Sequence, residues 1–205
     1  MTEKEKMISG KLYDPSDKEL EALRLQAHRL SKDYNDTYED EEEKREEILS
    51  KLIPNRSDGV YIQGPIQFDY GVFTTLGKNF YANFNLTILD VCPVTIGDNV
   101  LIGPNCSIMT PVHPFRYQDR NIRQREDGSL YDYEYAKPIT IKENCWLAAN
   151  VTVCGGVTIN EGCVIGAGSV VTRNIPPNSL AAGNPCKVIR QITEDDAIEL
   201  KKELF

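Results

Sequence analysis

The sequence contains only two histidines, and one of them is placed where an imidazole could act as a base. His113 lies in Thr110-Pro-Val-His-Pro-Phe115, where the nearby prolines restrict the backbone on both sides. Imidazole titrates near neutrality, as a general base requires. Position alone fits a surface histidine without a role equally well. His28 lies in a charged stretch with helical spacing, where a solvated or packing role is the simplest interpretation.

Amide and aromatic side chains precede His113 and could bind a ligand with many hydroxyl groups. They occur in Tyr81-Ala-Asn-Phe-Asn85 and Leu89-Asp-Val-Cys-Pro93. Asn and Asp are unfavourable in strands unless they form hydrogen bonds, which favours a polyhydroxyl ligand. The alternative is that the asparagines only fill turns. Trp146, the only tryptophan, falls in an outward position and predicts stacking on a ligand or on another subunit.

A few basic residues near the C-terminal end could contact a phosphate-bearing cofactor. Lys187 and Arg190 follow Pro185, and Arg173 precedes a pair of prolines. Three bases on a surface segment are common, so this signal is weak. The sequence has no glycine-rich phosphate loop between a strand and a helix, and it has no Walker pattern.

The charge balance of the 205 residues limits the partners. Lys and Arg total 23 and Asp and Glu total 31, so the net charge is −8. This balance argues against a nucleic-acid or membrane surface. The stretch 39–47 alone holds seven acids and two bases, and we interpret it as a solvated helix face rather than an acidic partner site.

The cellular compartment is predicted from the same composition. No apolar run approaches the ~20 residues of a membrane span, and the charged beginning differs from a signal peptide. The six cysteines include no C-x-x-C pair, which favours a reducing compartment. We therefore expect a cytoplasmic protein.

The elements that must position these side chains follow a period of six residues. Apolar residues keep this spacing strictly over Ile96–Ile108 and Ile141–Val171, and two-residue slips extend the frame back to Ile62. Small or β-branched residues stand four positions after most of them. Period six fits neither a helix nor a simple hairpin ladder, and it predicts short strands coiled three to a turn of about 18 residues. Cys106, Cys145 and Cys163 occupy small inward slots, so we interpret them as buried apolar residues. The recurring positions are Ile62, Phe68, Leu76, Ala82, Ile88, Ile96, Ile102, Ile108, Ile141, Leu147, Val153, Ile159, Ile165 and Val171.

The chain divides into three segments. Residues 1–58 are predicted to be helical, with a capping box at Ser16-Asp-Lys-Glu19 and a second helix over about Glu39–Ile53. Residues 59–190 form the coil, except for a loop at 110–137, because the step from Ile108 to Ile141 is not a multiple of six. Residues 191–205 are predicted to form a short helix capped by Thr193.

Longer stretches of the sequence resemble the maltose/galactoside O-acetyltransferases, which are hexapeptide-repeat enzymes. The resemblance implies a trimer of left-handed parallel β-helices, with active sites between subunits, that moves acetyl from acetyl-CoA to a sugar hydroxyl without a metal. The matching stretches are Glu3-Lys-Glu-Lys-Met-Ile-Ser-Gly-Lys-Leu-Tyr13, Asn79-Phe-Tyr-Ala-Asn-Phe84, Leu89-Asp-Val-Cys-Pro93, Ile96-Gly-Asp-Asn99, Pro111-Val-His-Pro114, Ile165-Gly-Ala-Gly-Ser-Val-Val-Thr172 and Gly183-Asn-Pro185.

The resemblance also assigns roles to residues of this sequence. His113 matches the catalytic base of the family. The acceptor pocket corresponds to Asp69, Tyr81 and Asn83, with Asp17 and Arg24 as weaker candidates, and Trp146 lines the site. The groove for acetyl-CoA corresponds to Ala149, Ala167, Thr172, Arg173, Lys187 and Arg190.

The chain also departs from the family pattern at three places. Val91 stands where the galactoside enzymes carry a second acid, Ala149 replaces a small polar residue, and the loop at 119–135 is longer than usual. These departures concern the acceptor rather than the reaction. The reaction implied is direct transfer, with His113 as the base, no acyl-enzyme, and a backbone N–H near Ala148–Ala149 for the oxyanion.

Three other functions compare with this one as follows from the sequence. A non-sugar acceptor, such as chloramphenicol or serine, would keep the mechanism and change the loop. A zinc enzyme of the carbonic-anhydrase type needs three histidine ligands, and the chain has two histidines. A non-catalytic solenoid would leave the combination of His113, Asn83, Lys187 and Arg190 unexplained.

Overall fold

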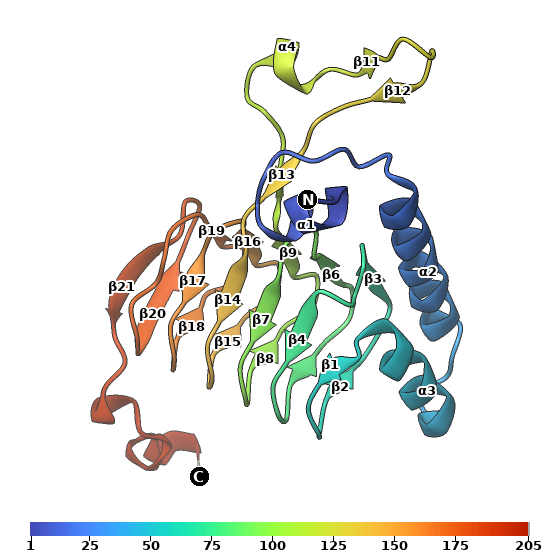
Figure 1. Cartoon of the computed structure of the whole chain (residues 1–205). Coiled ribbons are helices and arrows are strands. Elements are labelled where there is room, and N and C mark those ends of the chain that lie inside the picture. The colour runs from blue at the N-terminus through green and yellow to red at the C-terminus, as the bar shows by residue number, and fades with distance from the viewer. Residues whose placement is uncertain (205) are drawn as a thin grey trace.

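The body of the protein is a β-helix, and the computed structural model describes residues 1–204 of the chain (Figure 1). Its strands form three sheets, each named here after one of its strands. The β4 sheet contains β1 (Asn55–Arg56), β4 (Thr74–Leu76), β7 (Val94–Ile96), β14 (Ile139–Ile141) and β17 (Thr158–Ile159). The β6 sheet contains β3 (Ile66–Phe68), β6 (Leu86–Leu89), β9 (Ser107–Met109), β16 (Thr152–Cys154) and β19 (Val170–Val171).

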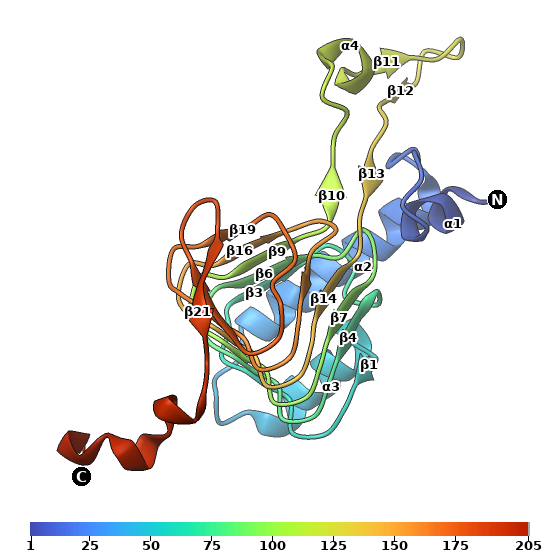
Figure 2. The same ribbon diagram turned by 90° about the vertical axis from the view of Figure 1, so that its left-hand side faces the viewer.

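The third sheet continues to the C-terminal end of the body. This β5 sheet contains β2 (Tyr61–Ile62), β5 (Tyr81–Ala82), β8 (Leu101–Ile102), β15 (Trp146–Leu147), β18 (Val164–Ile165), β20 (Ser179–Ala182) and β21 (Lys187–Gln191). Pairing within the three sheets is parallel except between β20 and β21. In Figure 2 the chain passes clockwise from the β6 sheet to the β4 sheet while it advances toward the viewer. The β-helix is therefore left-handed.

The period-six prediction is confirmed by burial, because all fourteen recurring positions lie in the core. Equivalent strands stack in register, so Ile62 pairs with Ala82 and Leu147 pairs with Ile165. One turn is 20 residues long in the first pair and 18 in the second. The exception is Val112, the expected small partner of Ile108, which is only half-buried because the chain leaves the coil there.

Asparagines occupy left-handed backbone conformations at the corners of the coil. Asn79, Asn99 and Asn144 have φ between 55° and 61°, a region that asparagine tolerates better than most residues. Their side chains form a ladder, in which Asn79 donates to Asn99 at 3.0 Å and Asn99 donates to Asn144 at 3.3 Å. Asn85, within the stretch 81–85, also has a positive φ of 61° and donates to Asn105 at 2.8 Å, so the turn-filling interpretation is confirmed for this asparagine.

Three helices precede the coil: α1 (Glu3–Ile8), α2 (Lys18–Asn35) and α3 (Glu42–Leu52). Figure 1 shows α2 and α3 covering the N-terminal end of the β-helix, where Tyr34 and Leu52 join its core. The predicted capping box at Ser16 is wrong, because Asp17 is the N-cap and its carboxylate accepts from the Glu19 and Leu20 N–H groups. The helix α1 was not predicted, although Thr2 caps it with a capping box of its own.

The loop predicted at 110–137 protrudes from the coil, and we call it the arm (Figure 1). Its base is an antiparallel pair of β10 (Pro111–Val112) and β13 (Tyr135–Ala136). Farther out lie α4 (Tyr117–Arg120) and a hairpin of β11 (Arg123–Gln124) and β12 (Leu130–Tyr131). The arm leaves the coil at the corner between the β6 sheet and the β4 sheet, named here the arm corner.

The C-terminal segment differs from the predicted helix. It forms three 3₁₀ turns, η1 (Glu194–Asp196), η2 (Ile198–Leu200) and η3 (Lys202–Leu204), although Thr193 caps the first turn as predicted. Figures 1 and 2 show this segment extending away from the β-helix, where no packed surface supports a longer helix. Residue 205 lies outside the described residues. Across residues 1–204, no helix has both the length and the apolar character needed to cross a membrane.

The carboxylate of Asp90 is buried at the arm corner and holds the first turn in place. It accepts hydrogen bonds from the N–H groups of Tyr70 (2.9 Å), Gly71 (3.1 Å) and Phe73 (3.3 Å) and from the Thr74 hydroxyl (3.0 Å). Burial raises the pKa of Asp90, and these hydrogen bonds oppose the rise. The polyhydroxyl-ligand interpretation therefore does not hold for Asp90, because its side chain is enclosed by its own chain.

We expect Asp90→Asn to lower the free energy of unfolding by about 3 kcal/mol, because an amide directs donors at groups that already donate. Urea denaturation of the two proteins measures this difference. Asp195→Asn, a change at an exposed carboxylate, is the matched control and should change stability by less than about 0.5 kcal/mol. Equal stability of Asp90→Asn and the unmodified protein would contradict this role.

Candidate active site

His113 lies at the root of the arm with a carboxylate beside it. Its side chain is half-exposed, and its Nε2 lies 3.8 Å from Oε1 of Glu134. The other oxygen of Glu134, Oε2, accepts a hydrogen bond of 2.7 Å from the Tyr13 hydroxyl. A solvent-accessible imidazole with an oriented carboxylate beside it is an arrangement suited to general-base catalysis.

Tyr13 belongs to the N-terminal segment, and its side chain is buried where this segment meets the arm. It pairs with Glu134 through both backbone groups, with Tyr13 N donating to Glu134 O at 3.0 Å and Glu134 N donating to Tyr13 O at 3.3 Å. Burial and the adjacent Glu134 carboxylate raise the pKa of Tyr13. Its hydroxyl therefore keeps its proton and remains a donor to Glu134.

A second group of charged residues lies nearby, where α2 packs against the β-helix. Asp69 follows β3 at the arm corner, and its Oδ1 lies 3.7 Å from Nε2 of His28. Burial raises the pKa of the Asp69 carboxyl, against the lowering effect of His28 and Arg24, and the charge of Glu134 adds to the rise. His28 thus faces a predicted acceptor residue, which its sequence position did not indicate.

The two weaker acceptor candidates have structural partners. Arg24 donates to the Tyr70 hydroxyl at 3.1 Å and to the carbonyl of Pro15. Asp17 caps α2 through one carboxylate oxygen. Both side chains therefore stabilise the region where the N-terminal segment meets the β-helix.

His113, Asp132 and Glu134 bring three potential ligand atoms within 4.8 Å of one another. Exposed acidic groups commonly meet in this way without an ion. A zinc site would require ligand atoms about 2.0–2.2 Å from a common centre. We interpret the group as one imidazole close to two carboxylates rather than as a metal site.

The other predicted residues lie at a different corner. Asn83, Ala149 and Ala167 line the corner between the β5 sheet and the β6 sheet, named here the alanine corner. The N–H of Gly168 donates to the carbonyl of Ala149 at 2.9 Å, which places the two alanine-bearing turns in contact. The Ala148 N–H donates to Ile165 within the coil, so Ala149 is the remaining candidate for an oxyanion donor.

A row of three aromatic side chains and one leucine lies on the outer face of the β5 sheet, beside the alanine corner. Tyr61, Tyr81, Leu101 and Trp146 stand in register on successive strands. Trp146 is 49% exposed, which confirms its predicted outward position. The rings of Tyr61 and Tyr81 are stacked 5.9 Å apart, and Asn83 donates to the Tyr81 hydroxyl at 3.2 Å.

The predicted cofactor residues separate into two sets. Lys187 pairs with Ala182 where β20 reaches the alanine corner, near Ala149 and Ala167. Thr172 and Arg173 instead follow β19 at the arm corner, four strands from Asp69 and thus about 19 Å away. Arg190 is engaged by Asp196 through two hydrogen bonds of 2.6 and 2.7 Å. Within one chain, Lys187, Ala149 and Ala167 therefore lie together, whereas Thr172 and Arg173 lie at a different corner.

Within one chain, the base is also separated from the predicted acceptor residues Tyr81 and Asn83, although Asp69 shares its corner. Strand β6 (Leu86–Leu89) runs between the alanine corner and the arm corner. Four residues of strand span about 13 Å. His113 and Asn83 consequently lie on different edges of the same β-helix, and a single chain does not bring them to one reacting centre.

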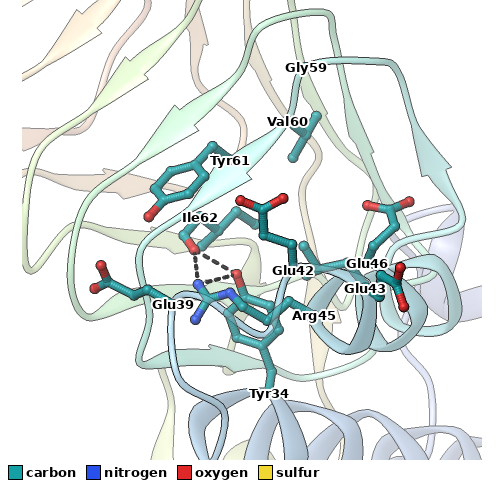
Figure 3. Close-up of a pocket in the computed structure, with 11 residues that line it drawn as sticks. Tyr34, Glu39, Glu42, Glu43, Arg45, Glu46, Gly59, Val60, Tyr61 and Ile62 are labelled. Carbon is teal, nitrogen blue, oxygen red and sulfur yellow. Dashed lines mark hydrogen bonds between the residues drawn. The ribbon is translucent and has the colours of Figure 1, made fainter.

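A pocket of about 600 Å³ lies elsewhere, between α3 and β2 (Figure 3). The guanidinium of Arg45 is buried beside it, donates to Ile62 O and the Tyr34 hydroxyl at 2.7 Å, and lies over the Tyr34 ring. Several glutamates of the acidic stretch line its rim. Among the described residues, its lining shares no member with the predicted site, and we interpret its contacts as joining α2 and α3 to the first turn.

Comparisons with known proteins identify both the capping segment and the coil. Residues 6–55 match the model of the maltose acetyltransferase hexapeptide capping motif. Residues 138–173 match the bacterial transferase hexapeptide, and residues 93–113 match the hexapeptide repeat of succinyl-transferase. The segments that cap and form the coil are therefore both found in known families.

Three similar proteins match nearly the whole chain. A galactoside O-acetyltransferase of Escherichia coli is 41% identical over 192 residues, which is 94% of this chain and 90% of that protein. A maltose O-acetyltransferase structure from Clostridium difficile has a TM-score of 0.85 and 44% identity, covering 95% and 99% of the two chains. A galactoside acetyltransferase in complex with coenzyme A has a TM-score of 0.86 and 40% identity, covering 96% and 94%.

The cysteines can be tested as nucleophiles. All six are free, and five are buried. Burial raises the pKa of Cys92 to about 11, which keeps that thiol protonated. We expect an aromatic disulfide reagent to label only half-buried Cys154 in the folded protein, and Cys154→Ser to remove this reaction. Rapid labelling of any other cysteine would contradict the assignment of these thiols to packing.

Proposed function

This chain belongs to the maltose and galactoside O-acetyltransferase family, and we propose that it transfers the acetyl group of acetyl-CoA to a sugar hydroxyl. The observation that carries this proposal is the half-exposed His113 held beside Glu134 at the root of the arm. It lies in a β-helix that matches sugar acetyltransferases over nearly its full length. The acceptor we propose is of the maltose, glucose or galactoside type.

The proposed mechanism is direct transfer. His113 takes the proton of the acceptor hydroxyl while the hydroxyl oxygen attacks the carbonyl carbon of the thioester. The C–S bond then breaks, the acetyl group stays on the sugar oxygen, and CoA leaves as a thiolate that regains a proton. A positioned base contributes roughly 10²–10⁴-fold to the rate. The backbone N–H of Ala149 would stabilise the charge that develops on the carbonyl oxygen.

We propose that the chain works as a homotrimer, with each site between two copies. The separation of His113 and Asn83 on different edges supports this arrangement, because a neighbouring copy can supply the missing half. The row of exposed Tyr61, Leu101 and Trp146 with half-buried Tyr81 supports it as well, since such rows are suited to contact between subunits.

The two halves would divide the binding of the two substrates. Asp69 at the arm corner of one copy, together with Tyr81, Asn83 and Trp146 of the next, would bind the sugar. Coenzyme A would follow the alanine corner along Ala149 and Ala167, with Lys187 contacting phosphate. Thr172 and Arg173 could join that groove from the arm corner of another copy.

The cellular setting and a second acceptor class complete the proposal. We place the reaction in the cytoplasm, in keeping with six unpaired cysteines.

A non-sugar acceptor is the alternative, and the exposed apolar side chains of the arm, Phe115 and Leu130 among them, favour it. Acetyl transfer to chloramphenicol or serine but to no sugar would support this alternative.

We expect acetyl-CoA-dependent release of free CoA with glucose, maltose or a galactoside as acceptor. His113→Ala should lower kcat by at least 10²-fold, because the positioned base is lost. Coenzyme A at 100 times its Kd should still stabilise the variant by ~2.7 kcal/mol, which shows that its fold and cofactor groove are intact. Undiminished turnover in His113→Ala would refute the role of the base, and neither turnover nor stabilisation in the unmodified protein would favour a non-catalytic solenoid.

Mixing two inactive variants tests whether the site lies between copies. His113→Ala and Asn83→Ala chains, unfolded together and refolded as mixed trimers, should recover about a quarter of the unmodified activity. A shared site is active only when one copy supplies His113 and its neighbour supplies Asn83. In random mixed trimers each condition is met with a chance of one half, so about a quarter of the sites are active. Variants refolded separately and then combined serve as the control. Recovery no greater than the sum of the two separate variants would place the whole site in one chain.

A further inference from the structure

Glu134 uses its two carboxylate oxygens for different partners. Oε2 accepts from the buried Tyr13 hydroxyl at 2.7 Å, and Oε1 faces Nε2 of His113 at 3.8 Å. The Glu134 side chain is only 20% exposed, whereas that of His113 is 50% exposed. The carboxylate is therefore held on one side by the protein and directed on the other toward the half-exposed imidazole.

The N-terminal segment fixes the position of Glu134. Tyr13 pairs with the Glu134 backbone in both directions, and this pairing joins residues 121 positions apart. Next to Tyr13, Asp14 forms an ion pair with Arg125 of the arm and donates its own N–H to Glu3 at 2.7 Å. These contacts attach the arm to the N-terminal segment at two points, so Glu134 has little freedom to leave His113.

We propose that Glu134 is a positioning residue for His113, anchored by Tyr13, an inference that rests on the proposed function of His113 as the base. A carboxylate beside Nε2 keeps a proton on that nitrogen, which leaves the lone pair on Nδ1 to receive the proton of the acceptor hydroxyl. When the ring accepts that proton, the negative charge of Glu134 stabilises the imidazolium. Glu134 itself gains and loses no proton in the cycle.

Other charged groups surround this pair, and they do not offer the same contact. Asp132 lies within 4.8 Å of both residues. Asp69, Arg24 and His28 lie farther along the corner and interact with one another. Glu134 differs from all of these because the buried Tyr13 hydroxyl fixes its orientation.

The first test measures kinetics with a matched control. Glu134→Gln keeps the size of the side chain and an acceptor for Tyr13, but it removes the charge. We expect kcat to fall about ten- to a hundredfold, because the imidazolium that forms during transfer loses the negative charge 3.8 Å away, with KM for acetyl-CoA unchanged. Glu126→Gln, at an exposed carboxylate of the same arm, should leave both constants unchanged.

A double-variant cycle separates positioning from a general structural role. In the His113→Ala background, Glu134→Gln should have no further effect on kcat, because its contribution passes through the missing imidazole. An equal loss in both backgrounds would overturn the proposal. Full activity of Glu134→Gln in the unmodified background would also overturn it.

The tautomer of His113 provides a readout that needs no acetyl transfer. The protein has two histidines, so ¹⁵N-labelled histidine gives two imidazole signals, and His113→Ala assigns them. We expect His113 to carry its proton on Nε2 in the unmodified protein and to lose this preference in Glu134→Gln, while His28 is unchanged. An unaltered His113 tautomer would overturn the proposal. If the unmodified protein transferred no acetyl group, the proposed function would fail, and this measurement would still decide the role of Glu134.

Discussion

The narrow interior of the coil is the constraint on which the rest of the structure depends. Most strands of the coil place one or two side chains inward, and each turn must stack on the next with its backbone paired. A longer or polar insertion cannot enter this interior without breaking the ladder, so it must leave at a corner. The arm does so between β9 and β14, and the residues we assign to chemistry lie at or beside the corners of the coil.

The N-terminal segment connects this rigid coil to the arm. Helices α2 and α3 close the first turn with apolar side chains, while Tyr13 and Asp14 attach the arm by hydrogen bonds and an ion pair. The arm carries both His113 and the Glu134 carboxylate beside it. The N-terminal segment orients that carboxylate through the Tyr13 hydroxyl, and the proposed neighbouring copy adds amide and aromatic groups.

Most of the coil could be predicted from the sequence, because burial at every sixth residue is a local pattern. Ile96–Ile108 and Ile141–Val171 follow it strictly, and the turns from Ile62 to Ile96 follow it with two-residue slips. Contacts that join distant segments left no such signal: Tyr13 and Glu134 are 121 positions apart, and nothing near either residue specifies the other. Arg190 shows the same limit, since nothing in its own neighbourhood indicated the two hydrogen bonds that it donates to Asp196.

The central claim is that His113 of one copy and the alanine corner of another form one acetyl-transfer site. A crystal structure with coenzyme A and a sugar bound tests it most directly. We predict a trimer in which the CoA sulfur lies between His113 of one copy and Asn83 and Trp146 of its neighbour, with the sugar hydroxyl beside His113. Coenzyme A bound away from His113, or a site formed within one chain, would contradict the account.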